Sequence, residues 1–126
     1  MNEPNRIGLT AVTGAQLDEL LTELNPPKGE TGVSLIKFDL YRLAVALGIK
    51  KGNPAPPLKD KTVPSFRVAE LDEDRVLYTA LENSALKPSD TSIYEYIERL
   101  AEHGISNFYN TFQQTGELPL EEYFQK

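Results

Sequence analysis

The chain has 126 residues, enough for one domain with its own hydrophobic core. It contains no cysteine, which excludes thiol catalysis, disulfides and a cysteine-ligated zinc site. The N-terminus lacks the basic and apolar regions of a secretory signal, and no stretch is apolar enough to cross a membrane, so we expect a cytoplasmic protein. The formal net charge is −6, yet residues 37–61 form a basic island with six basic and two acidic side chains. Such an island can contact phosphates, although chance clustering on a solvated surface explains it equally well.

The N-terminal residues have the pattern of a strand followed by a helix. Residues 6–10 alternate weakly between apolar and polar side chains, which indicates a short strand or an extended arm. Thr13 and Gln16 have the spacing of a capping box, and four leucines at helical spacing follow. A first helix is therefore predicted over residues 14–24. The prolines and glycine of residues 25–29 end it.

A glycine-containing turn at residues 31–34 leads into a second, strongly apolar helix, predicted over residues 34–48. Its apolar residues are too widely distributed for one narrow face, so we expect a buried central helix. Arg42 needs a partner in this helix, and a structural ion pair with Asp39 or a carboxylate of the next helix is favoured over a subunit contact. The neighbouring Tyr41 fits either the core or an interface.

The middle of the chain is predicted to contain a loop, a short strand and a third helix. Residues 50–64 are rich in lysine and proline and indicate an extended loop that carries most of the basic island. Phe66 and Val68 indicate a second short strand. The acidic residues 72–74 predict the start of a helix, because carboxylates are favourable at the positive end of its dipole. Metal ligation by these carboxylates is the weaker reading, since their spacing does not match a calcium loop.

Two further helices are predicted in the C-terminal half. The fourth covers residues 91–103 and ends at Gly104 in the left-handed conformation, and the fifth follows and ends before Gly116. His103 is expected to stabilise the end of the fourth helix rather than to act in catalysis. The aromatic residues of this half fit the core better than a base-stacking surface. They are Tyr94, Tyr109 and Phe112.

Together these patterns predict a mainly α fold, a compact single-domain bundle of about five helices with one or two short strands. The N-terminal half has the strand-helix-helix order of a ribbon-helix-helix module. The domain covers residues 1–126, with a core over 5–112 and a tail over 113–126 whose apolar side chains either dock or fray. Because no phosphate-binding glycine loop, activated nucleophile or metal set is recognisable, we expect a protein that is not an enzyme and has no cofactor or metal.

The chain resembles the DndE family of DNA sulfur-modification proteins over about residues 5–112. The resemblance rests on several short motifs in the right order and at similar spacing. They are Arg6-Ile7-x-Leu9-Thr10, Thr31-Gly32-Val33-Ser34, Arg42-Leu43-Ala44, Leu47-Gly48-Ile49, Arg75-x-Leu77-Tyr78-x-Ala80-Leu81 and His103-Gly104-Ile105. The resemblance implies a small, mostly helical bacterial protein that takes part in replacing a non-bridging phosphate oxygen of DNA with sulfur.

In that family a cysteine desulfurase and an iron–sulfur protein mobilise the sulfur, and the small helical member is an accessory component. The resemblance implies DNA and the other sulfur-modification proteins as partners, self-association into a homo-oligomer, and lysines as the DNA-binding residues. In this chain those lysines are Lys37, Lys50, Lys51, Lys59 and Lys61. The chain departs from the family by an insertion at residues 25–28, by Glu30 before the turn, and by its acidic net charge. It could equally be a version that contacts DNA only inside a larger complex.

Two other functions fit the same sequence. A ribbon-helix-helix-like transcription regulator would use residues 6–10 as its β-arm and residues 34–48 as its second helix, and it needs a dimer and a base-reading strand. A purely protein-binding adaptor would use the acidic C-terminal half as its contact surface, and it predicts no measurable DNA affinity even at low salt.

Overall fold

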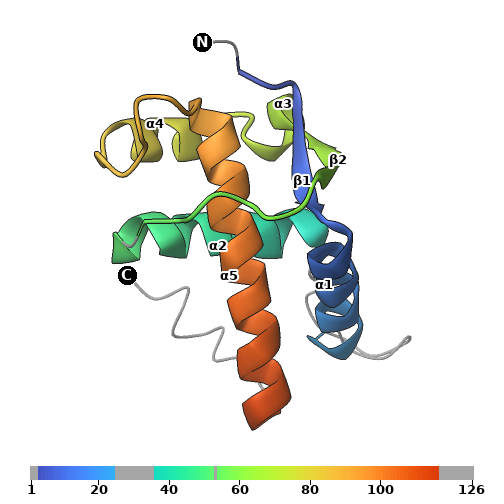
Figure 1. Cartoon of the computed structure of the whole chain (residues 1–126). Coiled ribbons are helices and arrows are strands. Elements are labelled where there is room, and N and C mark those ends of the chain that lie inside the picture. Colours follow the sequence, from blue (N-terminus) through green and yellow to red (C-terminus); the bar gives the residue numbers. More distant parts are fainter. Residues whose placement is uncertain (1–2, 25–35, 53, 117–126) are drawn as a thin grey trace.

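The computed structural model describes residues 3–24, 36–52 and 54–116, and it has a mainly α architecture with one two-stranded antiparallel sheet (Figure 1). The proline segment at 25–29, the turn at 31–34 and the tail beyond 116 lie outside these residues. In chain order the elements are β1 (Arg6–Thr10), α1 (Ala11–Leu24), α2 (Lys37–Lys51), β2 (Thr62–Arg67), α3 (Val68–Leu71), α4 (Val76–Glu82) and α5 (Ile93–Thr115).

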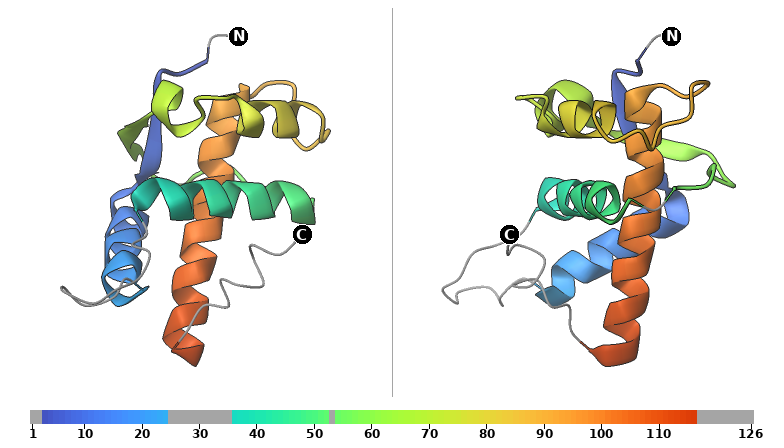
Figure 2. Two further views of the ribbon diagram at one scale, coloured as in Figure 1. Left: turned by 180° about the vertical axis from the view of Figure 1, so that it is seen from behind. Right: turned by 90° about the vertical axis from the view of Figure 1, so that its left-hand side faces the viewer.

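The long helix α5 is the centre of the fold, and α1, α2, α4 and β1 all pack against it (Figures 1 and 2). It begins after Ser92, whose hydroxyl accepts a hydrogen bond from the amide of Glu95 at 3.3 Å. Its predicted end before Gly116 is confirmed, since Gly116 has a left-handed backbone with φ of 79°. The predicted break at Gly104 is wrong. The helix continues through this residue, so the fourth and fifth predicted helices are one.

Gly104 has a packing role instead, at the point where α2 crosses α5. A Cβ atom built on Gly104 would lie 2.6 Å from the Cβ of Ala44, closer than real Cβ atoms approach each other. The absence of a side chain therefore lets the two helices come close. A glycine inside a helix lowers helix propensity, and here close packing explains its presence.

Several predicted boundaries are displaced in the structure. The first helix begins at Ala11 rather than at residue 14, because the hydroxyl of Thr10 accepts a hydrogen bond from the amide of Thr13 at 3.4 Å. The second helix ends at Lys51 rather than at residue 48. The next residue, Gly52, has a left-handed backbone and ends the helix. Its predicted start at residue 34 lies outside the described residues.

The sheet is short and irregular. Arg6 pairs with Arg67 at one end, and the register shifts around Gly8. A Cβ atom on Gly8 would lie 1.9 Å from the carbonyl oxygen of Val63, so only glycine fits at this irregularity. The second strand extends further towards the N-terminus than predicted, and Val68 begins α3 instead of lying in the strand. The predicted loop at 50–64 is correspondingly shorter at both ends.

Asp72 anchors the start of α4, which confirms the predicted role of an acidic residue at this helix. Its carboxylate accepts hydrogen bonds from the amides of Leu77 and Tyr78, at 2.9 and 3.0 Å, and from the hydroxyl of Tyr94 at 2.8 Å. Burial, followed by the bond to Asp72, raises the pKa of Tyr94. Tyr94 is therefore a buried core residue and not part of a base-stacking surface.

Arg42 does not form the predicted ion pair. Its Nε and Nη2 donate to the backbone carbonyls of Leu71 and Glu70, at 2.7 and 3.2 Å, so it ties α2 to α3. Its guanidinium also lies 5.3 Å from the ring centroid of Phe38. Asp39, the other predicted partner, accepts from the amide of Ile36 at 2.9 Å and closes the first turn of α2. Helix-terminal carbonyls are good partners for a guanidinium because they carry partial negative charge.

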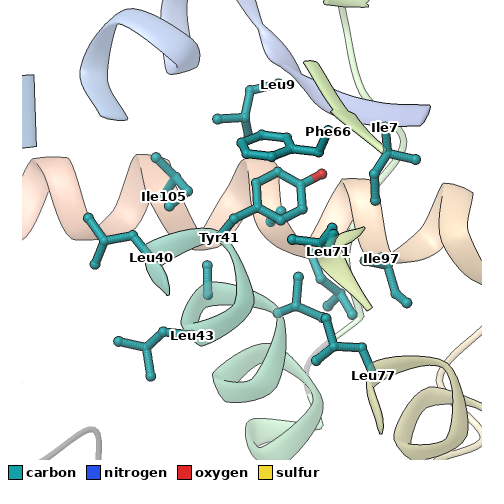
Figure 3. Packing of buried hydrophobic residues seen from close by; sticks show 14 of the residues in the cluster. Ile7, Leu9, Leu40, Tyr41, Leu43, Phe66, Leu71, Leu77, Ile97 and Ile105 are labelled. Carbon is teal, nitrogen blue, oxygen red and sulfur yellow. The ribbon is translucent and has the colours of Figure 1, made fainter. Parts of the chain in front are cut away.

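Tyr41 lies in the core between the sheet and α2 (Figure 3). It is fully buried, its ring centroid lies 4.5 Å from that of Phe66, and its hydroxyl donates to the carbonyl of Gly8 at 2.9 Å. Burial raises the pKa of this hydroxyl well above its usual value. Tyr109 and Phe112 are partly buried and pack against the same core, as predicted.

Candidate nucleic-acid interface

The C-terminal part of the basic island crosses α5. Residues 54–61, which we call the strap, leave the C-terminal end of α2, cross α5 and enter β2 (Figure 1). Three prolines, Pro54, Pro56 and Pro57, keep the strap extended, because proline restricts both its own backbone and that of the residue before it.

Hydrogen bonds to α5 fix both ends of the strap. At its start, the buried amide of Ala55 donates to the hydroxyl of Tyr96 at 2.8 Å, and the carbonyl of Pro56 lies 3.1 Å from Nε2 of His103. Just beyond its end, the hydroxyl of Thr62 donates to the Glu98 carboxylate at 2.9 Å. The strap is thereby held at a defined place on the surface of α5.

His103 has a different position from the one predicted. It lies inside α5 rather than at a helix end, because the helix continues through the following glycine. His103 lines a cavity of about 190 Å³ between α2, the strap and α5. Lys51 and Asn107 are polar residues of the same lining. His103 thus positions the strap. No pattern in the sequence could indicate this contact, since its partner is a backbone carbonyl 47 residues away.

Four of the five predicted lysines follow one path along the molecule. Lys50 and Lys51 are the last residues of α2, where positive charge is favourable near the negative end of the helix dipole. Lys59 and Lys61 lie on the strap. All four are exposed, and exposed Asp60 lies between the last two. The path therefore begins at the end of α2 and continues across α5 towards β2.

Lys37 is separated from these four. It lies at the opposite end of α2, and a helix of this length spans roughly 20 Å. Its Nζ forms an exposed ion pair with Asp18 at 3.1 Å. The predicted set thus divides into a group of four lysines and one distant residue.

Two carboxylates on α5 lie beside the C-terminal end of the strap, but both are engaged by hydrogen-bond donors. Glu98 accepts from the amide of Gly8 and the hydroxyl of Thr62, both at 2.9 Å. Glu102 accepts from the amide of Thr10 at 3.0 Å and from two threonine hydroxyls. Burial is the main cause that raises the pKa of Glu98. The sequence shows these carboxylates only as ordinary acidic positions of an amphipathic helix.

Within residues 3–24, 36–52 and 54–116, no group of three or more histidine, aspartate and glutamate side chains is arranged to bind a metal ion. No helix in this part of the chain has the length and apolar character needed to span a bilayer.

The sequence matches no protein-family model, no curated protein and no solved structure.

Proposed function

We propose that the protein is a non-catalytic component of a DNA phosphorothioation system, and that it binds DNA phosphates through the strap and the adjoining end of α2. The observation that carries this proposal is a path of four exposed lysines, two at the end of α2 and two on the strap, which hydrogen bonds hold against α5. The resemblance to DndE proteins supports the sulfur-modification role. Other proteins of the modification system are the expected partners, together with further copies of the chain.

Binding of this kind reads the phosphate backbone rather than the bases. Lysine ammonium groups are point charges that neutralise phosphates and release counterions, so affinity falls steeply with salt and depends little on sequence. If all four lysines contact phosphates of duplex DNA, the slope of log K against log salt should approach about −3.6. The remaining acidic surface repels DNA and confines contact to this path.

The ribbon-helix-helix alternative is disfavoured by the edges of the sheet. In that fold β1 pairs with the same strand of a second copy. Here β1 already pairs with β2, and along its other edge Gly8 and Thr10 donate their amides to Glu98 and Glu102. The outer edge of β2 contains Pro64, which lacks an amide hydrogen. Neither edge therefore suits an intermolecular ribbon.

The first experiment measures binding of the protein to an intact and a nicked duplex across a salt series. We expect salt-dependent binding that weakens in the Lys50→Gln/Lys51→Gln variant and is abolished in Lys50→Glu/Lys51→Glu, with the helical circular dichroism spectrum unchanged. Gln113→Glu/Gln114→Glu is the matched control, because it makes the same change in net charge as the glutamine variant but at an exposed site away from the strap.

The possible results separate the three functions. Full binding by the charge-reversed variant contradicts the proposed interface. Absence of binding at low salt leaves the adaptor, which acts only within a protein complex. A sequence-specific footprint would favour the transcription regulator.

A further inference from the structure

Two arginines are paired at the end of the sheet remote from the strap. Arg6 and Arg67 are register partners in the antiparallel ladder, so their side chains leave the same face of the sheet with Cβ atoms about 5 Å apart. Like charges placed directly opposite each other destabilise a sheet. Arg67 Nη1 forms an exposed ion pair with Glu70 Oε1 at 3.6 Å. Such a pair offsets little of the repulsion.

These arginines line an open cavity of about 620 Å³, together with a third, Arg75. The residues that line it come from the start of β1, from α3 and the turn after it, and from the first turn of α5. The guanidinium of Arg75 is placed by a stacking contact, since it lies 4.0 Å from the ring centroid of Tyr78. Three arginine side chains therefore line one cavity.

Three carboxylates line the same cavity, and none of these described side chains forms an ion pair with the three arginines. Glu3 accepts hydrogen bonds from the amides of Ile93 and Tyr94, at 3.1 and 2.9 Å, and so lies on the first N–H groups of α5. Asp72 is buried and accepts three hydrogen bonds, as described above. Glu73 is exposed. Glu3 and Asp72 are thus held by amide and hydroxyl donors rather than by the arginines.

We propose that this cavity is a phosphate-binding site, in which Arg6, Arg67 and Arg75 hold a phosphate group and Glu3 occupies part of the site when phosphate is absent. Guanidinium groups match phosphate geometry with paired hydrogen bonds. The Glu3 carboxylate is an anion of the chain itself, and a bound phosphate would replace it at the amides of α5. This site is separate from the strap and does not depend on the role of the strap in DNA binding.

The first test titrates the protein with inorganic phosphate and follows the amide resonances of Ile93 and Tyr94. We expect saturable shifts of both resonances, and about a tenfold loss of affinity in Arg6→Gln and in Arg67→Gln, as charge-assisted hydrogen bonds are removed. Neither variant should melt at a lower temperature, because each one relieves a repulsion between like charges.

Two further comparisons make the test specific. Glu3→Ala should tighten phosphate binding more than Glu73→Ala does, since both remove one negative charge from the cavity lining but only Glu3 lies on the helix amides. Lys50→Gln/Lys51→Gln should leave phosphate affinity unchanged. The proposal is overturned if the amides do not shift, if the arginine variants bind phosphate as the parent does, or if the lysine variant loses phosphate binding to the same extent.

A duplex titration then identifies the source of the phosphate. If the Arg6→Gln/Arg67→Gln variant, which keeps all four lysines, binds duplex DNA more weakly, the phosphate that the cavity binds belongs to the DNA backbone. Unchanged duplex binding together with lost phosphate binding assigns it to a free phosphate ligand. If only the lysine variants affect duplex binding and inorganic phosphate never binds, the inferred site fails while the proposed DNA-binding function remains.

Discussion

Glu98 and Glu102 lie one turn apart on α5 and accept hydrogen bonds from β1, yet they use their oxygens differently. Both donors to Glu98 bind the same oxygen, Oε2. The donors to Glu102 are divided, with the amide of Thr10 on Oε1 and two hydroxyls on Oε2. A glutamine amide has one acceptor oxygen and one donor nitrogen, so it replaces a carboxylate without changing the role of any partner only where a single oxygen accepts.

This difference predicts opposite outcomes for two otherwise identical substitutions. Glu98→Gln should keep both hydrogen bonds and leave the free energy of unfolding at neutral pH unchanged or slightly higher. Glu102→Gln places an NH₂ group against two threonine hydroxyls, which must turn from donating to accepting and so lose their charge-assisted bonds to the carboxylate. We expect it to lower the free energy of unfolding by about 1–2 kcal/mol. Urea unfolding of both variants measures the contrast, and equal losses of stability would contradict the assigned geometry.

The partly buried position of Glu98 also predicts a pH dependence. Burial raises the pKa of Glu98 above the ordinary value of 4.5, so between these two pKa values the folded state binds more protons than the unfolded chain. The contribution of Glu98 to stability therefore falls as pH rises through this window and is least favourable at neutral pH. Any stability advantage of Glu98→Gln over the parent should be largest at pH 7 and should shrink on acidification. An advantage that grows on acidification would contradict the raised pKa.

At the scale of the helices, local signals locate α1, α2, α4 and the span of α5, but they do not show the short α3 or the contacts that decide where the helices end. The leucine spacing of α1, the apolar run of α2 and Gly116 at the end of α5 are visible in the sequence. Gly104 has the sequence pattern of a helix end, because its packing partner Ala44 is 60 positions earlier in the chain and belongs to another helix. The sequence predicts an ion pair for Arg42, because backbone carbonyls are present at every residue and leave no pattern in a sequence.

The helix crossing gives a matched pair of glycine substitutions. Gly104→Ala would force its Cβ against Ala44 and its backbone, so we expect a loss of about 1–3 kcal/mol in the free energy of unfolding. Gly14→Ala in α1 meets no heavy atom within 4 Å and should gain about 0.5–1 kcal/mol, because alanine is the better helix former. Thermal melting of the two variants should move in opposite directions. A stabilising Gly104→Ala would show that the helices do not cross as closely as described.

For the whole molecule, the charge distribution predicted the location of the candidate interface, but the tertiary fold determines its shape. The basic island is evident from counting charges along the chain. Its division into a four-lysine path and a distant Lys37 depends on the length of α2 and on where the strap crosses α5. The anchors of the strap, Tyr96 and His103, contact residues 41 and 47 positions away, so no local pattern could reveal them.

The strap links the stability of the fold to its proposed function, and Tyr96→Phe tests that link without changing any charge. The substitution removes the hydroxyl that accepts from the buried amide of Ala55 and should lower the free energy of unfolding by about 1–3 kcal/mol. A loosened strap must be ordered again when DNA binds, so duplex affinity should fall severalfold while the slope with salt stays the same, because the lysines remain. Tyr109→Phe is the control. It removes a hydroxyl that bonds to Glu19 on α1 rather than to the strap, and it should leave duplex affinity unchanged. Unaltered affinity in Tyr96→Phe would mean that the lysines act without a fixed strap.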